Sequence, residues 1–211
     1  MSVKAKDQYE VLEYAPADLF RRAQLEEIFP NTPDRPLELD LGSGEGRFLL
    51  AMAAQFPDRN FLGIERLLGR VRKTARRALR ENRQNVRILR LDTTYAVHWF
   101  LPLQRFSRIH FLFPDPWPKN RHHRRRLFQS DFLQAVHRLL ATDGEFLFKT
   151  DHEHYFRHAQ RVIASVPFFE PIPWQPGDFF YPETDFERQW KAEGRSIWQL
   201  RLRKIAESSE G

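Results

Sequence analysis

Leu37-Glu-Leu-Asp-Leu-Gly-Ser-Gly-Glu-Gly46 joins a short apolar run to a turn that contains three glycines. Apolar residues follow the turn at helical spacing: Phe48, Leu49, Met52, Ala53 and Phe56. The run predicts a buried strand over 37–41, and the spacing predicts a helix over 46–56. Glycines permit a tight turn and let a ligand come close to the backbone. The stretch therefore predicts a strand, a glycine turn and a helix.

Strands and helices alternate along the rest of the chain. The apolar patterns predict further strands over 60–65, 86–91, 105–113, 145–149 and 196–203, and helices over 67–82, 125–140 and 152–166. Strands that alternate with helices are typical of an open, mostly parallel sheet with helices on both faces. The fold class that we expect is therefore α/β and doubly wound.

The composition limits the kind of protein. The chain has 211 residues, of which 41% are hydrophobic, and this predicts one globular domain of ordinary size. It has no cysteine, which excludes disulfides, thiolate metal sites and cysteine nucleophiles. No apolar run is long enough to span a membrane, and the first residues lack the apolar core of a signal peptide. We therefore expect a soluble, cytoplasmic protein.

Basic residues are in excess and are unevenly distributed. The chain has 34 Lys+Arg against 28 Asp+Glu, a formal net charge of +6. Between Arg66 and Arg90 there are ten basic residues and a single acid, Glu81. This distribution favours a polyanionic partner, although a solvated helix face over 67–82 is an equally good interpretation of those arginines.

An acidic residue lies at or just after the end of four successive predicted strands: Asp40, Glu65, Asp92 and Asp115. In doubly wound sheets, ligands bind at the carboxyl ends of the strands, near the point where the strand order reverses. One such acid is usually a helix cap or a solvated turn residue. Four acids that open to one edge of the sheet predict a ligand site.

The glycine turn does not fit a dinucleotide. Its pattern is Gly42-x-Gly44-x-Gly46 rather than G-x-G-x-x-G, and acidic Glu45 would face a pyrophosphate. The acids favour a neutral or cationic nucleoside instead. S-adenosylmethionine has this chemistry, because its amino group can pair with Asp40, its ribose with Glu65 and its adenine amine with Asp92.

The loop after the fourth predicted strand contains three prolines, at Pro114, Pro116 and Pro118. Proline fixes φ, so this loop should hold Asp115 and Trp117 rigidly. Five basic residues follow without an intervening acid, as a phosphate-binding surface requires: Lys119, Arg121, Arg124, Arg125 and Arg126. Trp117 has two equally good interpretations, a stacking platform for a displaced base or a core residue that caps the sheet.

Six motifs together resemble the bacterial tRNA (guanine-N7)-methyltransferase family. They are D-L-G-S-G-E-G-R-F over 40–48, G-I-E over 63–65, L-D over 91–92, F-P-D-P-W-P-K-x-R-H-x-x-R-R over 113–126, T-D-x-x-x-Y over 150–155 and T-D-F-E over 184–187. The resemblance implies a Rossmann-like class I methyltransferase domain with a seven-stranded sheet over 37–205. Residues 1–36 would then be an extension with a helical segment, packed on the core or partly mobile, and residues 206–211 a flexible tail.

The resemblance also implies an activity and its site. The methyl of S-adenosylmethionine would pass to N7 of a guanosine in tRNA, at position 46, with S-adenosylhomocysteine as the product. The residues implied to bind the cofactor are Asp40, Gly42, Gly44, Glu65, Asp92 and Asp115, with Asp115 also the catalytic acid. Those implied to bind tRNA are Lys119, Arg121, Arg124, Arg125, Arg126, Asp151, Thr184, Asp185, Phe186 and Glu187.

The residues themselves limit the chemistry further. Guanine N7 carries a lone pair and no proton, so Asp115 is better suited to position the base than to act as a general base. The histidines lack the spacing of metal ligands, and we expect no metal. We expect tRNA as the partner, no obligatory protein partner, and a monomer or homodimer.

Two alternative functions stay open at this point. The tetrapeptide Pro114-Asp-Pro-Trp117 resembles the loop of amino-group methyltransferases, which predicts methylation of adenine N6 or cytosine N4 instead. A non-catalytic RNA-binding module that retains the fold is the alternative of a different class. The acids at four strand ends favour an enzyme over such a module.

Overall fold

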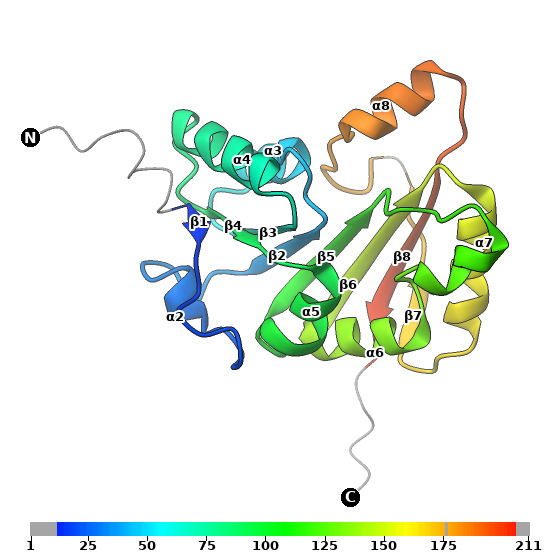
Figure 1. Cartoon of the computed structure of the whole chain (residues 1–211), viewed down its shortest axis with the longest axis horizontal. Coiled ribbons are helices and arrows are strands. Elements are labelled where there is room, and N and C mark those ends of the chain that lie inside the picture. The colour runs from blue at the N-terminus through cyan, green and yellow to red at the C-terminus, as the bar shows by residue number, and fades with distance from the viewer. Residues whose placement is uncertain (1–11, 176, 206–211) are drawn as a thin grey trace, which may run out of the picture.

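An eight-stranded sheet runs through the molecule, with helices on both of its faces (Figure 1). The computed structural model describes residues 12–175 and 177–205. The first eleven residues of the predicted extension and the predicted tail over 206–211 lie outside this part of the chain. Within it, no helix is long and apolar enough to cross a membrane.

The strands follow the order β1-β4-β3-β2-β5-β6-β8-β7. Their bounds are β1 Glu13–Tyr14, β2 Leu37–Leu41, β3 Asn60–Glu65, β4 Val86–Arg90, β5 Phe106–Leu112, β6 Leu140–Thr150, β7 Phe169–Ile172 and β8 Trp198–Lys204. All neighbours pair in parallel except β8, which is antiparallel to both β6 and β7. The strand order reverses between β2 and β5, so the ligand edge predicted from the sequence is centred on these two strands.

The doubly wound, mostly parallel α/β sheet that we predicted is confirmed. The six strands predicted by range correspond to β2 to β6 and β8, and β7 over Phe169–Ile172 was not among them. The eighth is the two-residue strand β1, which lies in the segment predicted as an N-terminal extension and pairs with β4. A two-residue strand is too short to show an alternating pattern, so β1 could not be predicted from the sequence.

Helices cover the two faces differently. Helices α3 (Arg47–Gln55) and α4 (Leu68–Arg80) lie over β2, β3 and β4 and form one apolar core with Phe61, Val86 and Ile88. The second core lies on the opposite face, where α6 (Ser130–Leu139) and α7 (Glu153–Ala164) pack on Phe146 and Phe148. All five residues of β2 are buried, as expected of a strand that is covered on both faces.

Short helical elements complete the fold. They are α2 (Leu25–Ile28), α5 (Thr93–Tyr95), the π-helix η1 (Ala96–Phe100), the 3₁₀-helix η2 (Asn120–Arg125) and α8 (Asp185–Ala192). In the described part of the extension, Leu25, Ile28 and Phe29 are buried in the second core, and the Ala23 amide donates to the Phe100 carbonyl. This part of the extension therefore packs on the sheet.

One predicted helix begins in the wrong place. The sequence predicts a helix over 125–140, but α6 begins only at Ser130. Residues 120–125 form η2 instead, and Gln129 has an extended backbone. The reason is that Arg126 and Phe128 are both buried, since the Arg126 guanidinium lies over the Tyr155 ring of α7 and the Phe128 ring packs on Phe148 of β6. Side chains two positions apart on a continuous helix point about 200° apart, so a helix would not bury both.

A long connection covers the remaining part of the face that carries α3 and α4. We call residues 173–184 the covering segment; Pro176 lies outside the described residues. The segment runs from β7 to α8 and crosses strands that present Arg108, Glu145 and Arg201 on this face. The Phe179 ring lies 4.3 Å from the Arg108 guanidinium carbon and 4.9 Å from that of Arg201. Both arginines pair with Glu145, so this half of the face is held by ion pairs and aromatic rings.

Candidate functional site

Four acids line one edge of the sheet. Asp40 is the fourth residue of β2, Glu65 ends β3, Asp92 follows β4 and Asp115 follows β5. Because these strands are parallel neighbours, their carboxyl ends open to the same edge. The acids that the sequence predicts as a site are thus brought to one edge of the sheet, around the point where the strand order reverses.

Asp40 is buried, with 3% of its surface exposed. Within the described residues, its carboxylate has no hydrogen bond and no ion pair. Burial, with the neighbouring charge of Glu65, raises the pKa of Asp40 to about 7. A buried carboxylate without a partner is costly to ionise. This side chain is therefore suited to receive a cationic group that enters from the edge of the sheet.

The glycine turn leaves room above its backbone. Gly42, Gly44 and Gly46 all have a positive φ, which other residues rarely adopt. A Cβ atom on Gly42 would have no heavy atom within 4 Å, whereas one on Gly46 would lie 2.1 Å from Cγ2 of Thr74. Gly46 thus lets the turn pack on α4, while Gly42 and Gly44 leave space where a ligand can approach.

Glu65 holds the turn in place. Its Oε2 accepts a hydrogen bond from the Gly44 amide at 3.1 Å, and its Oε1 accepts one from the Leu67 amide at 2.8 Å. A carboxylate has about four lone-pair sites, so two acceptor sites remain. Glu65 can therefore support the glycine turn and still accept hydrogen bonds from ligand hydroxyl groups.

Asp92 is exposed and caps the short helix α5. Its Oδ1 accepts hydrogen bonds from the amides of Thr94 and Tyr95, at 2.9 and 3.2 Å. Its Oδ2 has no hydrogen bond within the part of the chain that the structure describes. One oxygen thus orients the side chain, and the other is available at the edge of the sheet.

Asp115 is exposed in a loop that is fixed at both ends. The Phe113 amide donates to the Lys149 carbonyl at 2.8 Å, and Arg126 Nε donates to the Pro116 carbonyl at 2.7 Å. Phe113 and Trp117 both have a positive φ, at 51° and 42°. Prolines flank Asp115 on both sides, so its backbone has little freedom. The loop presents the carboxylate rigidly to solvent.

The basic residues after Asp115 fall into two groups. Lys119, Arg121, Arg124 and Arg125 are exposed. Arg126 is only 2% exposed, and its guanidinium lies over the Tyr155 ring at 4.9 Å. Our prediction of Arg126 as a surface cation does not agree with this position, because the side chain supports the proline loop from inside. The sequence offered no signal for the difference, since all five cations follow one another closely.

Trp117 belongs to neither apolar core. Its ring is partly exposed, meets His122 edge-on at 5.8 Å, and lies 5.0 Å from the Arg125 guanidinium carbon. The interpretation of Trp117 as a core residue is therefore not supported. Whether its ring stacks on a base stays a prediction.

The T-D-F-E motif forms the start of α8. Thr184 caps the helix, since its Oγ1 accepts from the Glu187 amide at 3.0 Å. Glu187 is 4% exposed, and both of its carboxylate oxygens lie 3.0 Å from Nζ of Lys149. Asp185 pairs with Arg47 of α3 at 2.8 Å, and Phe186 is 52% exposed. Asp185 and Phe186 of the motif are therefore exposed, whereas Glu187 is buried and the partly exposed Thr184 caps the helix.

Asp151 follows β6 and lies at the same edge as the other acids. It is partly exposed, and its Oδ2 is 3.5 Å from Nη1 of Arg195. Burial lowers the pKa of the neighbouring Lys149, although Glu187 opposes this effect. The Lys149–Glu187 pair thus joins β6 to α8 beneath the acids of the edge.

A buried polar chain under the site was not predicted. Arg59 Nη1 donates to Glu38 Oε1 at 2.8 Å, Glu38 Oε2 lies 2.9 Å from His110 Nε2, and His110 Nδ1 lies 2.9 Å from the Tyr181 hydroxyl. His110 is the register partner of Asp40 on the neighbouring strand. Burial and then the charge of Asp40 raise the pKa of Tyr181 well above its usual value. The covering segment therefore places a hydroxyl next to the buried acid.

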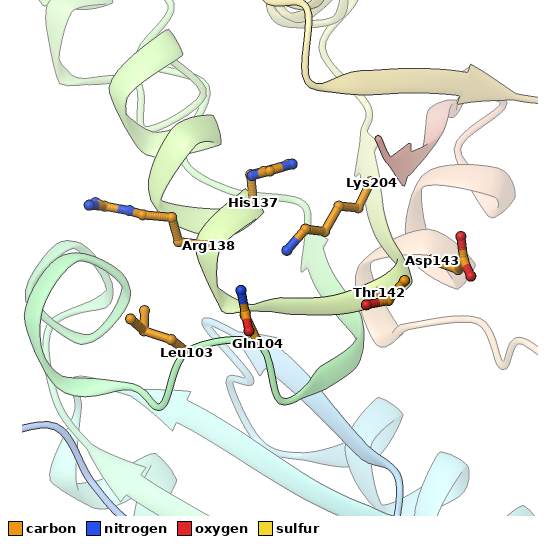
Figure 2. A pocket seen from close by; sticks show the side chains of 7 residues that line it. All are labelled: Leu103, Gln104, His137, Arg138, Thr142, Asp143 and Lys204. Carbon is orange, nitrogen blue, oxygen red and sulfur yellow. The ribbon is translucent and has the colours of Figure 1, made fainter. Parts of the chain in front are cut away.

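A hollow of about 550 Å³ lies elsewhere, at the amino end of the parallel strands (Figure 2). It is lined by Leu103, Gln104, His137, Arg138, Thr142, Asp143 and Lys204. His137 and Lys204 already bond to the carbonyls of Ile205 and Leu140. None of the four acids reaches this hollow, so it is not the predicted site. No cluster of acids and histidines among the described residues could hold a metal ion.

Comparisons with known proteins show the family and the fold. The family model "Putative methyltransferase" matches residues 34–200. The tRNA (guanine-N(7)-)-methyltransferase of Leifsonia xyli subsp. xyli is 35% identical over 86% of this chain and 81% of its own length. That of Thermotoga maritima is 31% identical over 79% of this chain, and the match spans about half of that relative, 53% of its length. The aminoglycoside resistance methyltransferase NpmB1 has a TM-score of 0.59, with 18% identity over 87% of this chain and 95% of its own, which shows a shared fold.

Proposed function

Because the chain belongs to the tRNA (guanine-N(7)-)-methyltransferase family, we propose that it transfers a methyl group from S-adenosylmethionine to N7 of a guanosine in tRNA, at position 46. The observation that carries the proposal is Asp40, a buried carboxylate without a partner among the described residues, beside an open glycine turn. A cationic nucleoside cofactor matches both features. We also propose that the protein acts in the cytoplasm.

The residues at the edge of the sheet fit this cofactor. Asp40 would receive its amino group, Glu65 its ribose hydroxyls and Asp92 its adenine amine. Gly42 and Gly44 would line its approach, because nothing but Gly42's own carbonyl lies within 4 Å of a Cβ placed on either. When bound, S-adenosylmethionine supplies an electrophilic methyl group on its sulfonium.

Asp115 would position the base. Guanine N7 presents an in-plane lone pair and has no proton to lose, so alignment matters more than proton abstraction. The Asp115 carboxylate can accept from guanine N1–H and from the N2 amino group. Its negative charge would also offset the positive charge that develops on the ring during methylation. The bonds that fix the proline loop hold the backbone on either side of Asp115.

The exposed residues beside Asp115 would hold the tRNA. Lys119, Arg121, Arg124 and Arg125 would contact its phosphates, and Asp151, Asp185 and Phe186 would face it from β6 and α8. Arg126, Thr184 and Glu187 would act indirectly, since they fix the loop and the helix that carry the surface residues.

The test is methylation of tRNA that lacks 7-methylguanosine, with purified protein and S-adenosylmethionine labelled in its methyl group. Digestion to nucleosides should give labelled 7-methylguanosine, and mapping should place it at position 46. Label in N6-methyladenosine or N4-methylcytidine would replace the proposal with the amino-group reaction. A protein that binds tRNA and cofactor but leaves no label would be a binding module.

A further inference from the structure

Helix α4 carries a face of basic residues that the proposed function does not use. Six of its thirteen residues are basic and none is acidic: Arg70, Arg72, Lys73, Arg76, Arg77 and Arg80. With 100° between successive residues, all six lie within about 160° of the helix circumference. Val71, Ala75 and Ala78 lie on the opposite side and are buried in the core. We call these six residues the α4 basic face.

The positive charges on this face repel one another. Residues four apart on a helix are neighbours, and such neighbours include Arg72 with Arg76 and Arg76 with Arg80. Two members of the face meet an acid at the glycine turn, since Lys73 pairs with Glu45 at 2.5 Å and Arg70 lies 3.8 Å from Glu65. Arg72 and Arg80 are exposed and have no ion pair in the described part of the chain. Repulsion among these cations destabilises the helix, and a bound polyanion would offset that repulsion.

The position of α4 indicates which polyanion. The helix begins beside Glu65 and packs on β3 and β4, so it flanks the acidic edge on one side. The segment that carries the exposed cations Lys119, Arg121, Arg124 and Arg125 follows β5 on the other side of the edge (Figure 1). It ends at Arg126, which contacts His154 and Tyr155 of α7. Phosphates are repelled by the acids in the centre and attracted by the cations on either flank.

We propose that the α4 basic face binds the sugar-phosphate backbone of the tRNA whose guanosine enters the acidic edge. This inference rests on the proposed function. The RNA would bridge the edge, with one stretch of backbone on α4 and another on the cations after the proline loop. At about 1.5 Å per residue, α4 is about 20 Å long, enough to follow several phosphates.

The experiment measures tRNA affinity as a function of salt for the double variant Arg72→Gln/Arg80→Gln. Glutamine keeps helix propensity and removes the charge. Two lost phosphate contacts should reduce the slope of log K against log salt by about 1.4 to 1.8. Cofactor affinity, measured by calorimetry, should stay within twofold of wild type. The variant Arg72→Lys/Arg80→Lys should keep most of the wild-type slope, because it keeps the charge.

The matched control is Arg105→Gln/Arg203→Gln, which removes the same charge from two exposed arginines near the amino end of the parallel strands. Its salt slope should equal that of wild type. A wild-type slope for Arg72→Gln/Arg80→Gln would overturn the proposal, and so would an equal loss in the control, which would reflect net charge alone. Binding is measured without turnover. A failure of methyl transfer would therefore contradict the proposed function, whereas the salt dependence of tRNA affinity would still test the role of the α4 basic face.

A combined variant tests whether the RNA binds both α4 and the cations after the proline loop. Adding Arg124→Gln and Arg125→Gln to the α4 changes should give the sum of the two reductions in slope, since distant contacts act independently. A combined reduction no larger than that of the loop changes alone would mean that α4 and the loop do not hold separate stretches of RNA, and would overturn the bridging model.

Discussion

The glycine turn after β2 and the proline loop after β5 present an aspartate in opposite ways. The two strands are parallel neighbours, yet Asp40 is buried without a partner among the described residues, and Asp115 is exposed. The turn is built from glycines with positive φ, and the loop from prolines tied by Phe113 and Arg126. Burial makes Asp40 receptive to a cation, whereas rigidity makes Asp115 a fixed acceptor. The same side chain thus serves two purposes because its surroundings differ.

The largest effect should come from Asp115→Asn. Asparagine keeps the shape, but it presents an amide to the guanine edge and removes the charge that offsets the developing cation. We expect single-turnover methyl transfer to fall by about 10²- to 10³-fold at saturating cofactor, with tRNA binding retained. The residual rate should lack the pH dependence of a lost general base. A rate within threefold of wild type would show that the exposed acid is dispensable.

Asp40→Asn should act on cofactor affinity instead. Losing a charged hydrogen-bond acceptor lowers affinity by tenfold or more, which corresponds to roughly 1.5 to 3 kcal/mol. Calorimetry on wild type, Asp40→Asn and Glu65→Gln would measure this, and unchanged affinity in both variants would remove the assignment of the cofactor site. Thermal unfolding would confirm that the variants fold.

The raised pKa of Asp40 adds a pH dependence with a definite sign. A cationic group binds the ionised form, so cofactor affinity in wild type should fall as pH drops below about 7, and Asp40→Asn should lose this dependence. In the cofactor-free protein, the raised pKa of Asp40 lowers the stability of the folded state as pH rises from the ordinary carboxyl range to about 7. Asp40→Asn should therefore melt at a higher temperature than wild type at pH 8. A lower melting temperature would contradict the buried, unpaired state of Asp40.

Variants of Arg126 and Arg124 should distinguish a residue that supports the proline loop from one that contacts RNA. Arg126→Gln removes the buried donor to the Pro116 carbonyl, which costs about 1 to 3 kcal/mol of stability and loosens the loop. Arg124→Gln changes an exposed side chain and should leave the melting temperature unchanged while the KM for tRNA rises. Equal melting temperatures for the two variants would show that Arg126 does not hold the loop.

The smallest effect should come from Tyr181→Phe. Tyr181 belongs to the covering segment and contacts His110 of β5, the register partner of Asp40 on β2. The change removes one hydrogen bond to His110, worth about 1 kcal/mol, and keeps the ring against Phe48. We expect a modest fall in melting temperature, with kcat within twofold of wild type. A tenfold loss of kcat with unchanged stability would instead place this hydroxyl in the reaction.

Most of the sheet could be predicted because its signals are local. The apolar runs at 37–41 and 60–65 and the glycines between them depend only on neighbouring residues, and the strands match those runs. The acids at the strand ends were located for the same reason. Their roles as cofactor and base contacts stay predictions.

What escaped prediction depends on contacts between distant segments. Glu187 looked like a surface residue because its partner, Lys149, is 38 positions away on β6. Arg126 is buried among cations that are exposed, and only the packing of α7 distinguishes it. The chain from Arg59 to Tyr181 left only weak signs, namely His110 beside the apolar residues Ile109 and Phe111 and Glu38 within the apolar run 37–41.

The insertion of β8 between β6 and β7 sets an order on biosynthesis. Among the strands of the described residues, β7 pairs with β8 alone, and β8 follows the covering segment and α8 in the chain. A ribosome therefore makes β7, the covering segment and α8 before it makes the strand that attaches them to the sheet. The glycine turn and the proline loop, by contrast, are complete once β6 and α7 have emerged. The acids of the site can therefore be in place before β8 attaches the covering segment and its aromatic rings to the sheet.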